Sequence, residues 1–204
     1  EIKFVGEAEV QRTARMVIES VRRSNFLAHL PGILFVGQST EQQRTRFFVG
    51  MEMLHECLHV SKGKECTVTL SDLVRRWAAR RLPVSTFKHV LDHVATTLWH
   101  LNANSITFVH GDLHGGNVLV RIPRSKIGTT IEPSDVSSVH LIDMGMSYMA
   151  SYMDGKEFVS MPPNFKNARI YGGSPTPPPF RDLLCLYLSL YPHMPTTKGW
   201  EGPK

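Results

Sequence analysis

Three side chains suited to phosphate transfer lie in two short polar stretches of the chain. Asp112 and Asn117 belong to the stretch H-G-D-L-H-G-G-N at residues 110–117, and Asp143 belongs to L-I-D-M-G at residues 141–145. Moving a phosphoryl group from a nucleotide needs a carboxylate beside the attacking hydroxyl. It also needs an amide and a second carboxylate to hold the magnesium ions that neutralise the phosphates. Asp112, Asn117 and Asp143 supply this set in that order.

Short apolar runs flank both polar stretches and predict the strands that would position them. These runs are residues 106–109, 118–120 and 139–142. Gly115 and Gly116 permit the sharp backbone path that a tight loop between two strands requires. Two antiparallel strands would bring Asn117 and Asp143 to one metal ion, and residues 122–138 between them are expected to form an extended hairpin loop.

A second chemical interpretation uses the histidines of the first stretch. His110, Asp112 and His114 alternate along the chain, so their side chains can point to one side and form the metal site of a hydrolase. This hypothesis leaves Asn117 and Asp143 without a role. The phosphate-transfer interpretation uses all three acidic and amide side chains, and we therefore prefer it.

The two stretches resemble the catalytic and metal loops of the protein-kinase-like superfamily, which usually read H-R-D-x-x-x-x-N and D-F-G. H-G-D-L-H-G-G-N is closest to the form in aminoglycoside and choline kinases and in small atypical protein kinases. Gly111 replaces the Arg that meets an activation-loop phosphate, so switching by phosphorylation of that loop is not expected. Met144 replaces the Phe of D-F-G, which leaves metal binding by Asp143 intact. His114 stands where many protein kinases carry a Lys that touches the transferred phosphate, which implies a hydrogen-bonding catalytic role.

The resemblance implies an α+β fold with two lobes. Residues 1–58 would form a partial small lobe with a helix, at least two strands and a hinge. Residues 59–204 would form a mainly helical large lobe that carries both loops and is incomplete at its C-terminus. We therefore expect a fragment, or a strongly reduced kinase, that runs from the family's small-lobe helix to the helix after the metal loop.

Three segments fit the expected small lobe. Residues 6–23 carry apolar side chains at helical spacing and predict an amphipathic helix. Residues 33–36 and 47–49 predict two strands, with the polar residues 38–46 as their turn.

The segment 51–54 falls at the family's hinge, which grips adenine through backbone groups. The resemblance implies that Met51 is the gatekeeper and that the carbonyl of Glu52 and the amide of Leu54 contact the base.

The small-lobe ion pair of the family has two candidate sets here, because no G-x-G-x-x-G precedes residue 6. In the first, Glu7 opens the helix in an F-x-x-E motif, and its Lys partner lies upstream of this sequence. In the second, residues 2–4 end a strand, and Lys3 pairs with Glu19 on the helix. Both alternatives stay open at this point.

The expected large lobe contains three further helices. One begins near residue 70 and is capped by Thr69 or Ser71. The clearest spans residues 84–101. Its apolar side chains form a single stripe made of Phe87, Val90, Leu91, Val94, Leu98 and Leu101. The last spans residues 180–190 and is apolar nearly all round, which predicts burial in a core. By resemblance, Asp182 near its start accepts hydrogen bonds from the backbone of the catalytic loop; a carboxylate that only favours the helix dipole is the alternative.

Composition limits the possible partners. A net charge of +5 and a pI near 9.2 invite a nucleic-acid hypothesis, but the basic residues are scattered. The tightest cluster, at residues 75–76 and 80–81, has no aromatic residues interleaved with it, so it is best explained as a solvated helix face. We therefore expect no nucleic-acid partner. We also expect no membrane partner, because no apolar stretch approaches the length that spans a bilayer.

The three cysteines, Cys57, Cys66 and Cys185, are odd in number and lack C-x-x-C spacing. This pattern suggests neither a disulfide framework nor a zinc site, and a reducing, cytoplasmic location is the simplest inference.

Together these features predict a phosphotransferase that uses ATP and Mg²⁺ and transfers the γ-phosphoryl group to a hydroxyl, most simply Ser or Thr of a protein. A small hydroxylated acceptor, as in aminoglycoside and choline kinases, is one alternative. The other is a pseudokinase, a folded module that binds nucleotide or protein without catalysis.

Overall fold

The computed structural model describes residues 2–21, 27–41, 44–52, 54, 64–77, 82–103, 106–153, 156–160 and 181–194. Within them, the α-helices are α1 (Ile2–Ser20), α2 (Leu70–Trp77), α3 (Val84–Leu101) and α4 (Arg181–Leu190). The strands are β1 (Ile33–Glu41), β2 (Arg44–Met51), β3 (Glu65–Thr69), β4 (Ile106–Val109), β5 (Val118–Pro123), β6 (Ser138–Leu141), β7 (Tyr148–Met153) and β8 (Lys156–Ser160). Short 3-10 turns are η1 (Arg124–Lys126), η2 (Pro133–Asp135) and η5 (Tyr191–His193). This mixture of helices and small sheets agrees with the expected α+β class.

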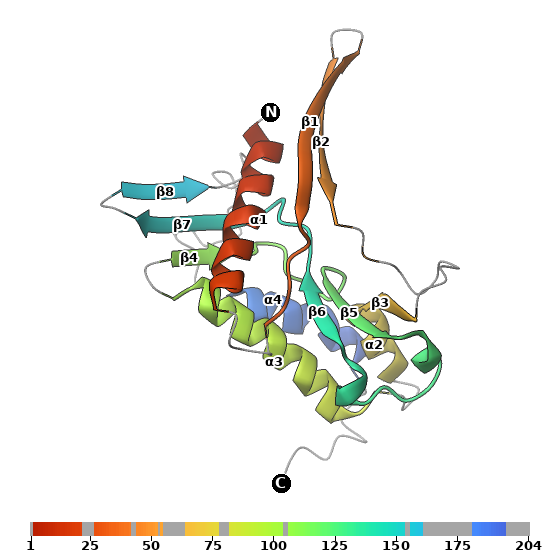
Figure 1. The fold of residues 1–204 in the computed structure, drawn as a ribbon. Helices are drawn as coiled ribbons and strands as arrows, with labels where there is room; N and C mark the ends of the chain where they lie inside the picture. The colour runs from red at the N-terminus through yellow and green to blue at the C-terminus, as the bar shows by residue number, and fades with distance from the viewer. Residues whose placement is uncertain are drawn as a thin grey trace.

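The strands form three small antiparallel sheets with orders β1-β2, β3-β5-β6 and β4-β7-β8. Figure 1 shows the β1-β2 hairpin projecting beside α1, with the two three-stranded sheets on opposite sides of the view. The first polar stretch connects β4 to β5, and the second follows β6. Both polar stretches therefore lie at the ends of strands, as the sequence predicts.

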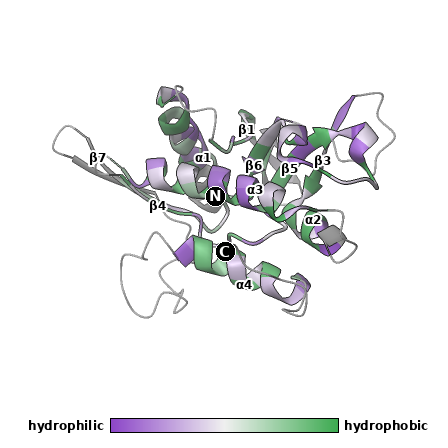
Figure 2. Ribbon diagram, turned by 90° about the horizontal axis from the view of Figure 1, so that it is seen from below, coloured by the Kyte–Doolittle hydropathy of each residue, from purple (hydrophilic) through white to green (hydrophobic). Residues whose placement is uncertain are grey.

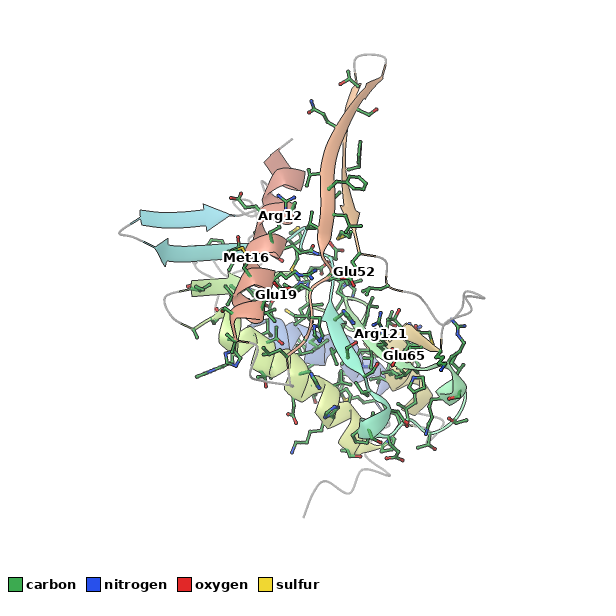
Figure 3. The ribbon with its side chains drawn as sticks, in the orientation of Figure 1. Arg12, Met16, Glu19, Glu52, Glu65 and Arg121 are labelled. Carbon is green, nitrogen blue, oxygen red and sulfur yellow. The ribbon has the colours of Figure 1, made fainter. Side chains whose placement is uncertain are left out.

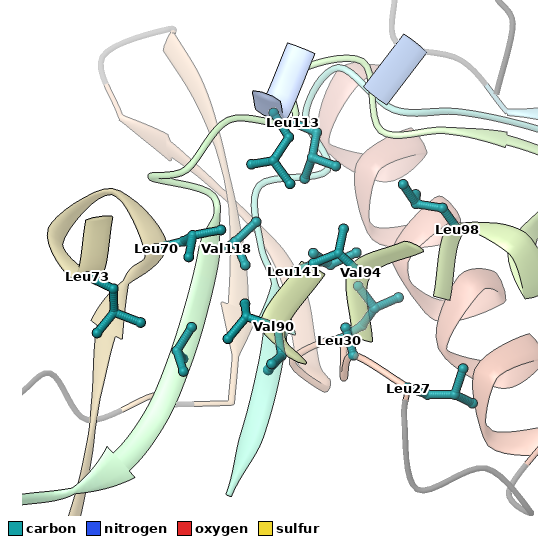
Figure 4. Packing of buried hydrophobic residues seen from close by; sticks show 14 of the residues in the cluster. Leu27, Leu30, Leu70, Leu73, Val90, Val94, Leu98, Leu113, Val118 and Leu141 are labelled. Carbon is teal, nitrogen blue, oxygen red and sulfur yellow. The ribbon is translucent and has the colours of Figure 1, made fainter. Parts of the chain in front are cut away.

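Helix α3 forms the centre of the core and confirms the apolar stripe predicted for residues 84–101. Val90, Val94 and Leu98 are at most 4% exposed. Figure 4 shows Val90 and Val94 near Leu141 of β6 and Leu30 from the segment before β1, with Leu98 on the side toward α1. One continuous apolar cluster extends from α1 to α4, so every element that carries the polar stretches rests on the same core.

The segment between α1 and β1 attaches to the sheet that precedes Asp143. His29 forms a parallel bridge with His140: its amide donates to the Val139 carbonyl at 2.7 Å, and its carbonyl accepts from the Leu141 amide at 2.9 Å. Gln11 of α1 donates a side-chain hydrogen bond to the Pro31 carbonyl. These contacts tie α1 to β6.

Helix α1 begins earlier than the sequence predicts, which overturns one candidate ion pair. Residues 2–4 lie in the helix and are not the end of a strand. Lys3 and Glu19 are therefore 16 positions apart on one helix, which at a rise of about 1.5 Å per residue separates them by about 24 Å. The Lys3–Glu19 pair is wrong; Glu19 instead pairs with Arg15 at 2.8 Å. A short apolar run is ambiguous between strand and helix, and here it extends the helix.

The β1-β2 hairpin is longer than predicted. Residues expected as a polar turn, 38–46, mostly continue the two strands, and Glu41 faces Arg44 across the last described position. Polar side chains are compatible with strands that are exposed on both faces, so polarity alone marked too long a turn.

Helix α4 corrects the prediction of a helix buried all round. Asp182, Leu186 and Leu190 are at most 2% exposed, whereas Leu184 and Leu188 are more than half exposed. Figure 2 shows α4 at the edge of the molecule, with one side turned away from the other elements. The uniformly apolar sequence of α4 does not indicate which face another element will cover.

Helix α2 settles the choice between two candidate caps. The Asp72 amide donates to Oγ1 of Thr69 at 3.0 Å, and Oγ1 of Thr69 donates to the Asp72 carboxylate at 2.8 Å. Thr69 is therefore the cap, and Ser71 lies inside the helix. Of the predicted basic cluster, residues 75–76 lie on α2, and residues 80–81 lie outside the described residues.

Cys66 corrects the expectation that no disulfide forms. This residue of β3 is disulfide-bonded, whereas Cys185 on α4 is a free, exposed thiol. An odd number of cysteines is compatible with one bridge and one free thiol. Cys57 lies outside the described residues.

Candidate functional site

The polar loop after β4 is held at its start by a buried carboxylate of α4. The amides of His110 and Gly111 donate hydrogen bonds to the two carboxylate oxygens of Asp182, at 2.7 and 3.0 Å. Asp182 is 2% exposed, so both bonds are shielded from water. Burial raises the pKa of Asp182, and His110 and the two amide donors oppose this shift. The supporting role predicted for Asp182 is confirmed.

His110 connects the first polar loop to the second. Its Nε2 donates to the carbonyl of Ile142 at 3.0 Å, and its own carbonyl accepts from the Ser147 hydroxyl at 2.9 Å. Burial lowers the pKa of His110 despite the neighbouring Asp182 carboxylate, so the ring is neutral with its proton on Nε2. His110 is therefore a buried brace between the loops. His110 is 0% exposed, whereas the Asp112 and His114 side chains are about half exposed. The three side chains therefore do not share one accessible surface, which disfavours the hydrolase hypothesis.

Asn117 holds the loop in the conformation that presents Asp112. Its side-chain Nδ2 donates to the backbone carbonyl of Asp112 at 2.9 Å, and its backbone N–H donates to the carbonyl of His114 at 2.9 Å. Asn117 is only 6% exposed, whereas the Asp112 side chain is 51% exposed. The loop thus keeps one side chain inside and turns the carboxylate of the other outwards.

The antiparallel pair β5-β6 brings the second loop to the first. Val118 faces Leu141, and the Ile142 amide donates to the Asn117 carbonyl at 3.1 Å, so Asp143 follows one residue beyond this bond. Asp143 has a φ of 63°, in the left-handed region that Asp adopts more readily than most residues. The register therefore places Asn117 and Asp143 at the same end of the strand pair, as predicted.

The atoms available at this end fit a hard divalent cation. Because Nδ2 of Asn117 is used within the loop, the amide oxygen is the atom that can coordinate. The Asp143 carboxylate is exposed, and its described hydrogen bond is a long one from the Gly145 amide at 3.4 Å. An amide oxygen and an accessible carboxylate match the ligands that Mg²⁺ takes beside nucleotide phosphates. Asn117 and Asp143 would hold the ion.

His114 faces the carboxylate of Asp112 from within the same loop. Its Nδ1 accepts a hydrogen bond from the Gly116 amide at 3.0 Å, so its remaining nitrogen, Nε2, points a proton outwards. Nε2 lies 4.0 Å from the Asp112 carboxylate, and both side chains are about half exposed. This geometry leaves the Nε2 proton accessible from solvent, next to the carboxylate.

Sequence reasoning missed a second attachment of the loop to α4. The Gly115 amide donates to the Ser189 hydroxyl at 3.0 Å, and the Gly115 carbonyl accepts from the Ser71 amide of α2 at 3.0 Å. Asp182 and Ser189 are seven residues apart, which puts both on the same face of α4. The seven-residue spacing of these two polar residues could have indicated the second attachment from the sequence. The loop is therefore bound near both the start and the end of α4.

Gly115 and Gly116 lie in the tight turn that the Asn117-to-His114 backbone bond closes, as predicted. The left-handed φ of 81° belongs to Gly111. A Cβ at residue 115 would come within 2.5 Å of both the Leu190 and Ser71 side chains. Gly115 is thus needed for close packing between α2 and α4.

The predicted adenine-binding residues lie at and just after the end of β2. Among the described residues, no hydrogen bond or ion pair links them to the two loops. Met51 is exposed, and Leu54 is half-buried. The Glu52 amide donates to the Gly32 carbonyl at 2.8 Å, and its carboxylate accepts from the Gly32 amide at 3.2 Å. Glu7 lies on α1, but its side chain is outside the described part of the chain. The roles of Met51, Glu52, Leu54 and Glu7 stay predictions.

Comparison with known proteins adds no relative. A scan against protein-family models finds no match, and a search of curated proteins finds none either. Among the described residues, no helix is both long enough and apolar enough to cross a membrane.

Proposed function

We propose that this protein is a kinase-like phosphotransferase that moves the γ-phosphoryl group of ATP to a hydroxyl. The observation that carries the proposal is the bonding around the two loops. Asp182 holds the start of the first loop, His110 joins it to the second, and Asn117 fixes the backbone of Asp112. These contacts attach both loops to the same support, which favours one site for the carboxylate, amide oxygen and second carboxylate that phosphoryl transfer requires.

Each side chain has a distinct role in the proposed reaction. Asp112 orients the acceptor hydroxyl and takes its proton, because its carboxylate is the exposed one on the loop. Asn117 and Asp143 supply the oxygens for Mg²⁺, which when bound neutralises the charge on the ATP phosphates. His114 donates a hydrogen bond from Nε2 beside Asp112, where the transferred group would pass. Positioning and charge neutralisation account for most of the catalysis.

The acceptor in this proposal is Ser or Thr of a protein. Asp112 and His114 are both about half exposed, so a bulky chain can reach the carboxylate. The finer family features follow the same resemblance: a two-lobed arrangement divided near residue 58, and an adenine hinge at Met51, Glu52 and Leu54. We also propose a cytoplasmic location, where ATP and Mg²⁺ are abundant, although the disulfide at Cys66 removes the cysteine argument for it.

The proposal is tested by thermal shift with ATP, in the presence and absence of Mg²⁺. The wild type should gain stability from ATP only when Mg²⁺ is added. Asp143→Asn should lose this metal dependence because the variant lacks one anionic ligand. Asp112→Asn should keep the shift but lose transfer of labelled phosphate to a Ser/Thr peptide library.

Asp92→Asn is the matched control, because Asp92 is an exposed carboxylate on α3 away from both loops. It should behave as the wild type in both assays. Full transfer activity in Asp112→Asn would refute the base assignment. A metal-dependent shift without transfer to any acceptor would favour the pseudokinase alternative.

A further inference from the structure

A polar cavity lies beside the sheet β3-β5-β6, apart from the loops. Its volume is about 380 Å³, and its walls come from α1, the segment before β1, Glu52 and the three strands. Asp112, Asn117 and Asp143 do not line it. It is therefore separate from the phosphotransfer site.

The strand register gathers the polar side chains of this cavity. Arg121 of β5 faces Thr67 of β3 on one side and Ser138 of β6 on the other. Because alternate residues of a strand share a face, Glu65 lies on the same face as Thr67, and His140 on the same face as Ser138. Glu65, Arg121, Ser138 and His140 all line the cavity. Figure 3 shows Arg121 and Glu65 close to each other at this sheet, with Glu52 beyond them.

His140 carries a buried polar atom without a partner at this cavity. The residue is 7% exposed, and its Nε2 shares a hydrogen bond with the Ser138 hydroxyl at 2.9 Å. Its Nδ1 is buried and has no hydrogen-bond partner. A buried ring nitrogen left unpaired is unfavourable, and this cost is carried by a residue that lines the cavity. Burial, with His29 and Arg121, lowers the pKa of His140 to about 4, so the ring adds no charge at neutral pH.

The charged groups of the cavity leave one cation and one anion available. Arg15 is already paired with Glu19 at 2.8 Å and with Glu52 at 3.7 Å. Among the described residues, no ion pair involves Arg121 or Glu65. They stand at diagonal positions on neighbouring strands, where side chains begin about 7–8 Å apart. That separation suits two groups that grip a small molecule between them.

We propose that this cavity binds a small zwitterion of the free α-amino acid class. Its carboxylate would meet Arg121, and its ammonium group would meet Glu65. An ion of one sign would satisfy only one of the two charged groups. The proposal does not depend on phosphotransfer by the loops. Because Glu52 and Arg15 join the end of β2 to α1 beside the cavity, a bound ligand would also stabilise that junction.

The test is thermal shift of the whole chain with each proteinogenic L-amino acid at millimolar concentration. At least one amino acid should raise the melting temperature by a few degrees in a saturable manner. Ethylammonium chloride and sodium acetate at the same concentration, singly or mixed, should not. Arg121→Gln and Glu65→Gln should each lower the affinity for that amino acid at least tenfold.

Two control variants keep the result specific. Arg12→Gln changes an exposed arginine of α1 that lies outside this cavity, and Asp112→Asn changes the phosphotransfer loop; both should bind as the wild type. Circular dichroism and the melting temperature without ligand establish that Arg121→Gln and Glu65→Gln fold. The proposal is overturned if no amino acid gives a saturable shift, if acetate or ethylammonium alone matches it, or if Arg121→Gln binds unchanged.

Discussion

Asn117 uses the two ends of one amide for different purposes. The nitrogen end fixes the backbone at Asp112, and the oxygen end is available to a cation. Asp could supply only the oxygen, and Ser is too short to span the same distance. An amide at this position thus couples the placement of the proposed base to the proposed metal ligand, which a carboxylate pair would not do.

At the same scale, the two neighbouring glycines of the loop should differ sharply when changed. Gly115→Ala should lower the free energy of unfolding by about 1–3 kcal/mol, because the new methyl group meets a helix backbone as well as two side chains. Gly116→Ala is the matched control: its Cβ would meet only the His114 ring, at 2.8 Å, which can move.

Urea denaturation measures both variants. Equal stability of Gly115→Ala and Gly116→Ala would contradict the tight packing of residue 115 between α2 and α4. Displacement of the ring in Gly116→Ala should appear instead as a changed His114 imidazole resonance in NMR.

Helix α4 is the element that orders the first loop. Asp182 near its start and Ser189 near its end bind opposite ends of the loop, while Leu186 between them packs into the core. A helix is stiff over this length, so it sets the distance between the two attachment points. The exposed side of α4, which carries Leu184 and Leu188, takes no part in this role.

Substitutions on the two sides of α4 should therefore have different consequences. Ser189→Ala leaves the Gly115 amide without its acceptor and should cost about 1 kcal/mol of stability, and Asp182→Asn should cost about 1–3 kcal/mol because one buried amide loses its acceptor. Both should also weaken the Mg²⁺-dependent shift with ATP. Leu188→Ala is the control, because Leu188 is 58% exposed and lies on the side of α4 that does not bind the loop.

The measurement is urea denaturation together with the ATP thermal shift. If Ser189→Ala lowers stability but leaves the nucleotide-dependent shift at its wild-type value, Ser189 stabilises the fold without positioning the loop.

At the scale of the whole molecule, one apolar core supports both the loops and the polar cavity. The cluster contains Val10 of α1, Leu141 of β6 and Leu190 of α4. His110 and His140 are buried beside this cluster, and they stay neutral because burial lowers the pKa of each. The stability of the folded chain should therefore respond to acid through its histidines.

For His140, the folded pKa of about 4 lies below the unfolded value of 6.5. The unfolded chain thus binds a proton first as pH falls, so stability is full above pH 6.5 and declines from there towards pH 4. The contribution of this residue reaches about 3 kcal/mol at most. Denaturation at a series of pH values should show a shallower decline in His140→Gln. An unchanged slope in that variant would show that His140 is not buried as a neutral ring.

Local pattern was sufficient to predict several features of this chain. These features are the apolar stripe of α3, the strands beside the first polar stretch, the strand before the second, and the helix that begins near Asp182. Each follows from the spacing of residues that are close in the chain. Local pattern failed where an outcome depended on distant parts of the chain. The covered face of α4, the clamp at Ser189 and the packing at Gly115 each require two elements to meet.

The order of acidic and amide groups in residues 110–117 and 141–145 was determined by the sequence alone, because catalytic chemistry depends on residue type and short-range spacing. Only the tertiary structure decided which atoms are free to act. Strand register set Asn117 beside the start of the second loop, and it also gathered Glu65, Arg121 and His140 around one cavity. Register joins residues far apart in the chain through backbone hydrogen bonds, and no local pattern in a single strand specifies its partner.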